Sequence, residues 1–172
     1  MGSHDDAGWL APEAALGRFR PPAHTGTGLS AASGRRFGFQ VGGVGFLIDP
    51  TLSSEVLEQL PTFPVPHTPD WLVGIANLRG NLVPVLDLAR LWQWSRRAEP
   101  ARLLVLDRGE RAVGLVVDRL PVTLTPGQPL AMPPPLPAIL RDHIIAAYTK
   151  EETLWLDYDH HGLFQSIAAQ LR

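Results

Sequence analysis

The chain has 172 residues, of which 45% are hydrophobic and 19% are charged. This composition is typical of a folded globular protein, and the length allows one substantial core or two small subdomains that share one. Fifteen Lys and Arg against seventeen Asp and Glu give a formal net charge of −2, so the chain lacks the broad positive field that binds a phosphate backbone. We therefore expect no nucleic-acid partner.

Cysteine is absent from the sequence, which excludes disulfides, thiolate metal sites and cysteine nucleophiles. No apolar stretch approaches the roughly 20 residues that a membrane-spanning helix needs. The first residues also lack the basic flank and apolar run of a signal peptide. Together these features predict a cytoplasmic protein.

Residues 1–35 predict an N-terminal extension, since much of this segment consists of Ala, Gly, Ser, Thr and Pro. Apolar side chains at Trp9, Leu16 and Phe19 are unusual in a pure spacer, so we expect the extension to be flexible or partly docked. Residues 36–172 form the predicted domain.

Short apolar runs separated by turn-forming residues dominate that domain. The 16 Gly and 17 Pro of the chain are spread between these runs, which favours many short strands over long helices. In chain order, we predict strands at 37–41, 44–48, 51–60, 75–78, 82–86, 102–107, 112–117, 121–126, 140–148 and 153–158. The segment 51–60 can also be read as a short amphipathic helix, and we favour the strand.

Three helical segments are predicted between and after the strands. A single turn is expected to begin at Thr68-Pro69-Asp70, where a hydroxyl and a proline give a helix-start signal. One or two turns are expected at 88–92, and a C-terminal helix within 162–172. The proline-rich segment 126–137 is expected to stay outside any sheet.

Many short strands with few helices indicate a mainly β protein. The polar loop after Trp94 falls near the middle of the chain, so two small barrels that share a core explain the pattern better than one sandwich. We expect the chain break between the two halves near residues 95–101.

A tight corner between two strands is the candidate partner-binding site. Apolar runs flank it, and Asn and Gly stand where the backbone must turn through positive φ. An arginine held there is exposed, either as a recognition residue or as a plain surface residue. The candidate site consists of Asn77, Leu78, Arg79, Gly80 and Asn81.

Catalytic chemistry has little support in the sequence. Asp87 and Asp118 each follow an apolar strand, where a carboxylate could act as an acid or a base, but capping of the next segment is favoured. No nucleophile elbow, Walker loop or dinucleotide fingerprint is present. We predict no catalytic residue, no cofactor and no metal ion. The alternative is a metal-dependent hydrolase that uses Asp157, Asp159, His160 and His161.

Residues 69–88 resemble the signature of the CheW family of chemotaxis coupling proteins. Trp71 stands shortly before Gly74-Ile75-Ala76-Asn77-Leu78-Arg79-Gly80, and a proline-centred strand then ends at Asp87-Leu88. Gly114-Leu115-Val116-Val117-Asp118 resembles the strand of the family's second subdomain. The resemblance covers about residues 36–171.

This resemblance implies two five-stranded SH3-like β-barrel subdomains that share a core, with short helices and a C-terminal helix. It implies a non-enzymatic adaptor that joins the regulatory domain of a CheA-type histidine kinase to the cytoplasmic tip of a methyl-accepting chemoreceptor. Membrane association would be indirect, through the receptor. The corner at Arg79, with Asn77 and Gly80, matches the motif that the family uses near its partner surfaces.

Two departures from a minimal coupling protein point to one branch of the family. The N-terminal extension and the proline-rich segment 128–137 are additional, and the start Phe37-Gly38-Phe39-Gln40-Val41 resembles the PilI branch. That branch serves the chemosensory systems that control type IV pili and twitching motility.

Overall fold

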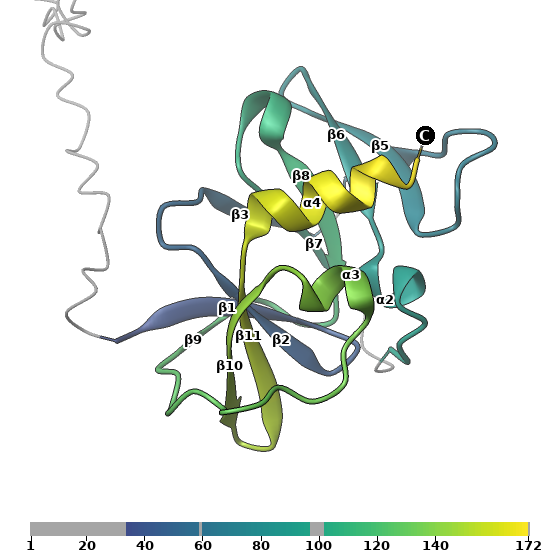
Figure 1. Ribbon diagram of the computed structural model, residues 1–172. Helices are drawn as coiled ribbons and strands as arrows, with labels where there is room; N and C mark the ends of the chain where they lie inside the picture. Colours follow the sequence, from purple (N-terminus) through teal and green to yellow (C-terminus); the bar gives the residue numbers. More distant parts are fainter. Residues whose placement is uncertain (1–33, 59, 97–101, 172) are drawn as a thin grey trace, which may run out of the picture.

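The computed structural model describes residues 34–58, 60–96 and 102–171, which form two β-sheets with a few short helices (Figure 1). A five-stranded sheet has the order β10-β11-β2-β1-β9, and a six-stranded sheet has the order β3-β7-β8-β6-β5-β4. The mainly β class is therefore confirmed. The predicted extension, apart from residues 34 and 35, lies outside the described residues.

The first sheet consists of β1 (Arg36–Val41), β2 (Val44–Ile48), β9 (Val122–Leu124), β10 (Ile144–Lys150) and β11 (Thr153–Tyr158). The second consists of β3 (Ser54–Leu57), β4 (Thr62–Phe63), β5 (Leu72–Leu78), β6 (Asn81–Leu86), β7 (Arg102–Leu106) and β8 (Val113–Val117). The helical segments are α2 (Leu88–Leu91), the 3₁₀ turn η2 (Gly109–Arg111), α3 (Ala138–Arg141) and α4 (His160–Ala169).

The two sheets do not correspond to two sequential halves of the chain. The five-stranded sheet takes β1 and β2 from the start of the domain and β9 to β11 from its end. The six-stranded sheet takes everything between them, and β8 pairs in parallel with β6. The predicted boundary near 95–101 therefore lies between β6 and β7, which belong to the same sheet. The chain passes from one sheet to the other after β2 and again after β8.

One apolar core is shared by both sheets and α4, as the sequence predicted. Phe39 and Phe46 enter it from the five-stranded sheet, Leu104 and Leu115 from the six-stranded sheet, and Leu163 from α4. All five side chains are buried. Figure 1 shows α4 lying across the six-stranded sheet, although the chain enters the helix directly from β11.

Two predictions of secondary structure are wrong. No helix begins at Thr68, because its hydroxyl donates to the Val65 carbonyl oxygen and the Leu72 N–H donates to the Pro69 carbonyl oxygen, which closes a turn leading directly into β5. The strand predicted at 140–148 begins only at Ile144, since the preceding residues form α3. Packing of Leu140 in the core favours the helical turn there.

Within the described ranges, no helix is long and apolar enough to span a bilayer.

Gly45 in β2 offers a test of the core. A Cβ built at this position would overlap the indole of the buried Trp155, which lies on the strand paired with β2. We expect Gly45→Ala to lower the free energy of unfolding by about 1–3 kcal/mol through overpacking. Urea denaturation would measure this change. The control is Gly127→Ala, whose new Cβ would make only an ordinary 3.7 Å contact with the Thr149 carbonyl oxygen. Equal effects of the two substitutions would contradict the predicted overpacking.

Candidate partner-binding site

The predicted corner is the two-residue turn of the β5–β6 hairpin. Leu78 pairs with Asn81, and the two residues between them have left-handed backbones, with φ of 51° at Arg79 and 87° at Gly80. This is the geometry of a type I′ turn, which matches the twist of its flanking strands. The Asn77 side-chain oxygen accepts a hydrogen bond from the Gly80 N–H at 2.8 Å. The sequence pattern therefore placed this turn correctly.

Arg79 extends from this turn to the edge strand β3. Its two terminal nitrogens bind the two carboxylate oxygens of Glu55 at 3.0 and 2.7 Å, in a bidentate ion pair. In the sheet order, β7 and β8 lie between β3 and the hairpin strand β6, so this contact indicates that the sheet is rolled and brings the hairpin tip toward its edge strand. The Arg79 side chain is nevertheless 74% exposed.

This ion pair adds little to the stability of the fold. Exposed pairs contribute at most about 1 kcal/mol, because water and salt screen them. A fork-to-fork pair does, however, restrict the direction of the guanidinium. We infer that Glu55 holds Arg79 in one orientation while leaving most of its surface accessible.

An open hollow of about 350 Å³ lies beside the pair, at one end of the rolled sheet. Charged and polar side chains form part of its rim, and Val83, Val105 and Ala112 form part of its wall. The predicted residues differ in position. Leu78 is half-buried, whereas Asn77, Arg79, Gly80 and Asn81 are exposed. The corner thus presents a charged rim around a partly apolar depression.

The other residues of the motif have structural roles. Trp71 is buried, and its carbonyl oxygen accepts a hydrogen bond from the Asp87 N–H at 2.7 Å. The Asp87 carboxylate caps α2 by accepting from the Arg90 N–H, and it also pairs with Arg96 at 2.9 Å. The predicted cap at Asp87 is confirmed. Trp94 packs on Trp92 with ring centroids 4.7 Å apart, at the edge of the core.

Asp118 differs from Asp87, and the cap predicted for it is wrong. Its side chain is buried, and neither carboxylate oxygen has a hydrogen-bond partner in the part of the chain that the structure describes. Its backbone N–H donates to the Gln40 carbonyl oxygen at 2.9 Å, which joins the end of β8 to β1.

An apolar groove of about 320 Å³ is a second surface feature, for which the sequence interpretation named no residues. Phe164, Ile167 and Leu171 of the C-terminal helical segment form one wall, and Trp71 and Leu86 contribute to the other. The helical spacing of those three side chains was visible in the sequence. The open groove between these side chains and the sheet, however, results from the position of α4 in the tertiary structure.

The proposed hydrolase site is not assembled. Asp157 forms a bidentate ion pair with Arg36 across the sheet, at 3.2 and 3.1 Å. Asp159 caps α4 by accepting from the Gly162 N–H. His160 is buried and His161 is exposed. Two of the four proposed ligands are therefore engaged elsewhere, and the hydrolase alternative has no support.

His160 is held in an apolar environment. Its ring packs edge-on against Phe164, with centroids 4.9 Å apart, and lies near Tyr158. Burial lowers the pKa of His160 from 6.5 to about 4, and the carboxylates of Asp107, Asp159 and Asp49 oppose this shift only in part. Burial likewise raises the pKa of Tyr158. The imidazole of His160 is therefore neutral at neutral pH.

Comparisons with known proteins identify the family of the chain. Residues 36–168 match the family model described as the CheW-like domain. The chain is 31% identical to Protein PilI of Pseudomonas aeruginosa over 136 residues, or 74% of each chain. It is 35% identical over 91 residues to Chemotaxis protein CheW of Rhizobium meliloti, covering 51% of this chain and 57% of that protein.

Among solved structures, the chain is similar to the scaffolding protein TtCheW from Thermoanaerobacter tengcongensis. The TM-score is 0.61 at 22% identity, with 76% of this chain and 86% of that chain covered. At this identity the similarity establishes the fold, and it agrees with the two-subdomain architecture that the sequence predicted.

The low pKa of His160 predicts a dependence of stability on pH. Because the imidazole titrates near 6.5 when unfolded and near 4 when folded, the unfolded state binds more protons between these values. Stability is therefore complete above pH 6.5 and falls as the pH decreases toward 4. Between pH 7 and 5 we expect a loss of about 2 kcal/mol that is missing in His160→Gln. Urea titrations of both proteins in chelator-containing buffer would measure it. Equal losses would show that the buried site does not hold the imidazole neutral.

Proposed function

The chain belongs to the CheW-like domain family, and from this premise we propose that it is a non-enzymatic adaptor coupling a methyl-accepting chemoreceptor to a CheA-type histidine kinase. The observation that carries the proposal is the Arg79 corner. A guanidinium held by Glu55 on a rigid turn, beside a partly apolar hollow, has the features of a protein-docking site.

The kinase is the partner that we assign to this corner. The family resemblance also implies that the regulatory domain of such a kinase is itself CheW-like, so one end of a β-barrel subdomain in each protein would meet the other. The exposed surface of Arg79 offers hydrogen-bond donors to such a partner, and Leu82, which is 71% exposed directly after the turn, offers apolar area. Docking would bury both.

The receptor is the partner that we assign to the apolar groove. The tip of a chemoreceptor is a helical hairpin, and an amphipathic helix binds by placing its apolar face in such a groove. Trp71, Phe164 and Leu171 provide apolar surface of this kind. The adaptor would act in the cytoplasm and reach the membrane only through the receptor.

The branch of the family is proposed from the PilI similarity. The 31% identity to Protein PilI extends over 74% of both chains, which is longer than the matched segment of the Rhizobium meliloti CheW. We therefore place the protein in a chemosensory pathway that controls type IV pili and twitching motility. Deletion of its gene would then reduce twitching and leave flagellar swimming unchanged.

Charge reversal at the corner tests the site. We expect Arg79→Glu to weaken binding to the CheA-type kinase of the source organism at least about ten-fold, or ~1.4 kcal/mol, because it places a carboxylate where the partner requires a cation. Arg141→Glu, on the exposed surface of α3, is the matched control and should bind like the wild type. Biolayer interferometry with the purified kinase would measure both.

A charge swap separates recognition from local structure. The double variant Glu55→Arg with Arg79→Glu restores an ion pair between β3 and the hairpin but reverses its polarity. If Arg79 contacts the partner, the swap remains defective. Recovery of wild-type affinity by the swap, or undiminished binding by folded Arg79→Glu, would show that the site assignment is wrong.

A further inference from the structure

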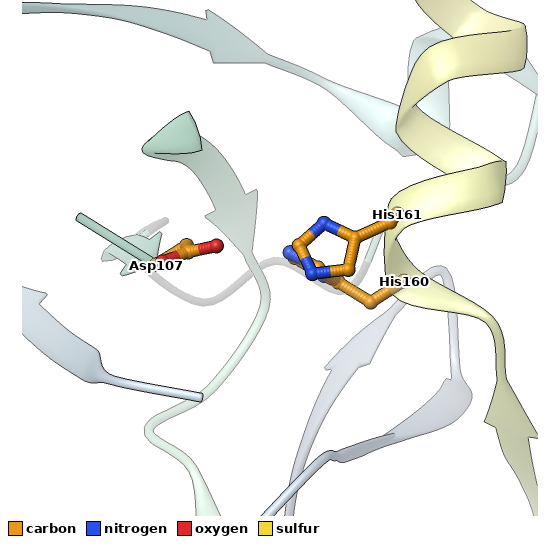
Figure 2. Close-up of side chains that lie close together, drawn as sticks. All are labelled: Asp107, His160 and His161. Atoms are coloured by element: carbon orange, nitrogen blue, oxygen red, sulfur yellow. The ribbon is translucent and has the colours of Figure 1, made fainter. Parts of the chain in front are cut away.

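Asp107, His160 and His161 converge on one point although they come from distant parts of the chain. Each offers one possible ligand atom, and these three atoms lie within 4.8 Å of one another. Figure 2 shows the Asp107 carboxylate pointing toward the two imidazole rings of the first turn of α4. Asp107 is more than 50 residues from His160 in sequence, so this grouping is a product of the fold.

Two buried polar atoms in this cluster lack hydrogen bonds. His160 is only 6% exposed, and its Nδ1 atom has no hydrogen-bond partner among the described residues; neither has Oδ2 of Asp107. A buried polar group without a hydrogen bond carries an uncompensated cost of desolvation. Oδ2 lies 3.3 Å from the Nε of Arg111, whose side chain is 71% exposed. A ligand that satisfies both atoms would remove this cost.

The backbone around the cluster is well anchored. Asp107 has a left-handed φ of 64°, and its N–H donates to the Ser53 carbonyl oxygen at 2.8 Å, while its Oδ1 accepts from the Arg108 N–H at 2.7 Å. On the other side, the Asp159 cap fixes the first turn of α4. The backbone around the cluster is thus held in place, and the three candidate ligand atoms can be brought closer together by side-chain rotation alone.

We propose that Asp107, His160 and His161 bind a divalent transition-metal ion of the zinc class, with water completing the coordination. Two imidazoles and one carboxylate suit such an ion, whereas calcium and magnesium prefer oxygen ligands. Ligand bonds of 2.0–2.2 Å in a tetrahedral site separate ligand atoms by about 3.3 Å. Each side chain must then move by roughly 1 Å, which exposed His161 and the Asp107 carboxylate accommodate by rotation.

Local charge favours a cation at this position. The carboxylates of Asp49, Asp107 and Asp159 all lie close enough to act electrostatically on His160. Arg111, which is 71% exposed, and the N-terminal end of α4 oppose them, but the helix end already carries its acidic cap.

Such an ion would join α4 to the turn after β7. Asp107 also contributes to the hollow beside Arg79 and Glu55, while His160 and His161 contribute to the apolar groove. A bound ion would thus fix α4, one wall of the groove, at a point that adjoins the partner-binding corner. This role is independent of the proposed adaptor function, because it needs neither kinase nor receptor.

Zinc binding by the purified full chain, without a polyhistidine tag, tests the proposal. We expect one Zn²⁺ per chain by isothermal titration calorimetry, and a rise in Tm of about 5–10 °C at a free zinc concentration one hundred times the Kd. His161→Ala should weaken binding at least about ten-fold, and Asp107→Asn likewise, because each removes one ligand. His161 is exposed, so its loss should leave the fold intact in chelator-containing buffer.

The control is His67→Asn, which removes an exposed histidine outside the cluster and keeps a residue that tolerates its positive φ of 62°. It should bind zinc like the wild type. Binding well below one ion per chain would overturn the proposal. So would equal affinity of His161→Ala, Asp107→Asn and His67→Asn, since this pattern indicates nonspecific binding to scattered imidazoles.

Discussion

Stacking around Phe46 joins the two sheets. Its ring lies 5.4 Å from that of Phe39 and 5.5 Å from that of Tyr158, both in its own sheet, and 5.8 Å from that of Trp92, which follows α2. The α2 segment is in turn attached to the six-stranded sheet through Asp87, whose N–H donates to the Trp71 carbonyl oxygen. This aromatic cluster therefore helps to fix the position of one sheet relative to the other.

The residues of the family motif divide between interior and surface. Trp71 and Asp87 are buried, and their polar groups form hydrogen bonds with the backbone and with α2. Arg79, which lies between these two residues in sequence, is exposed at the tip of the hairpin. The paired strands β5 and β6, which have side chains in a buried core, hold that tip in place. An exposed arginine in such a position loses little conformational entropy on docking, which favours affinity.

The two proposed surfaces meet at the turn that follows β7. Asp107 contributes to the hollow beside Arg79 and also faces the first turn of α4, which borders the apolar groove. The helix α4 follows β11 of the five-stranded sheet but packs on the six-stranded sheet. The position of α4 therefore depends on the arrangement of the two sheets relative to each other. An ion at Asp107, His160 and His161 would act on that relation directly.

Local patterns in the sequence determined the hairpins, the C-terminal helix and the Arg79 corner, because turn residues and apolar periodicity act over a few positions. Local signals failed where a longer-range interaction was stronger: Thr68 bonds to Val65 in place of capping a helix, and β5 begins before a helix can form.

Glu55, the partner of Arg79, is 24 residues away in sequence, and Asp107 is more than 50 residues from His160. Only the rolling of the six-stranded sheet and the passage of α4 across it bring these pairs together, since such contacts depend on strand order and on the shared core.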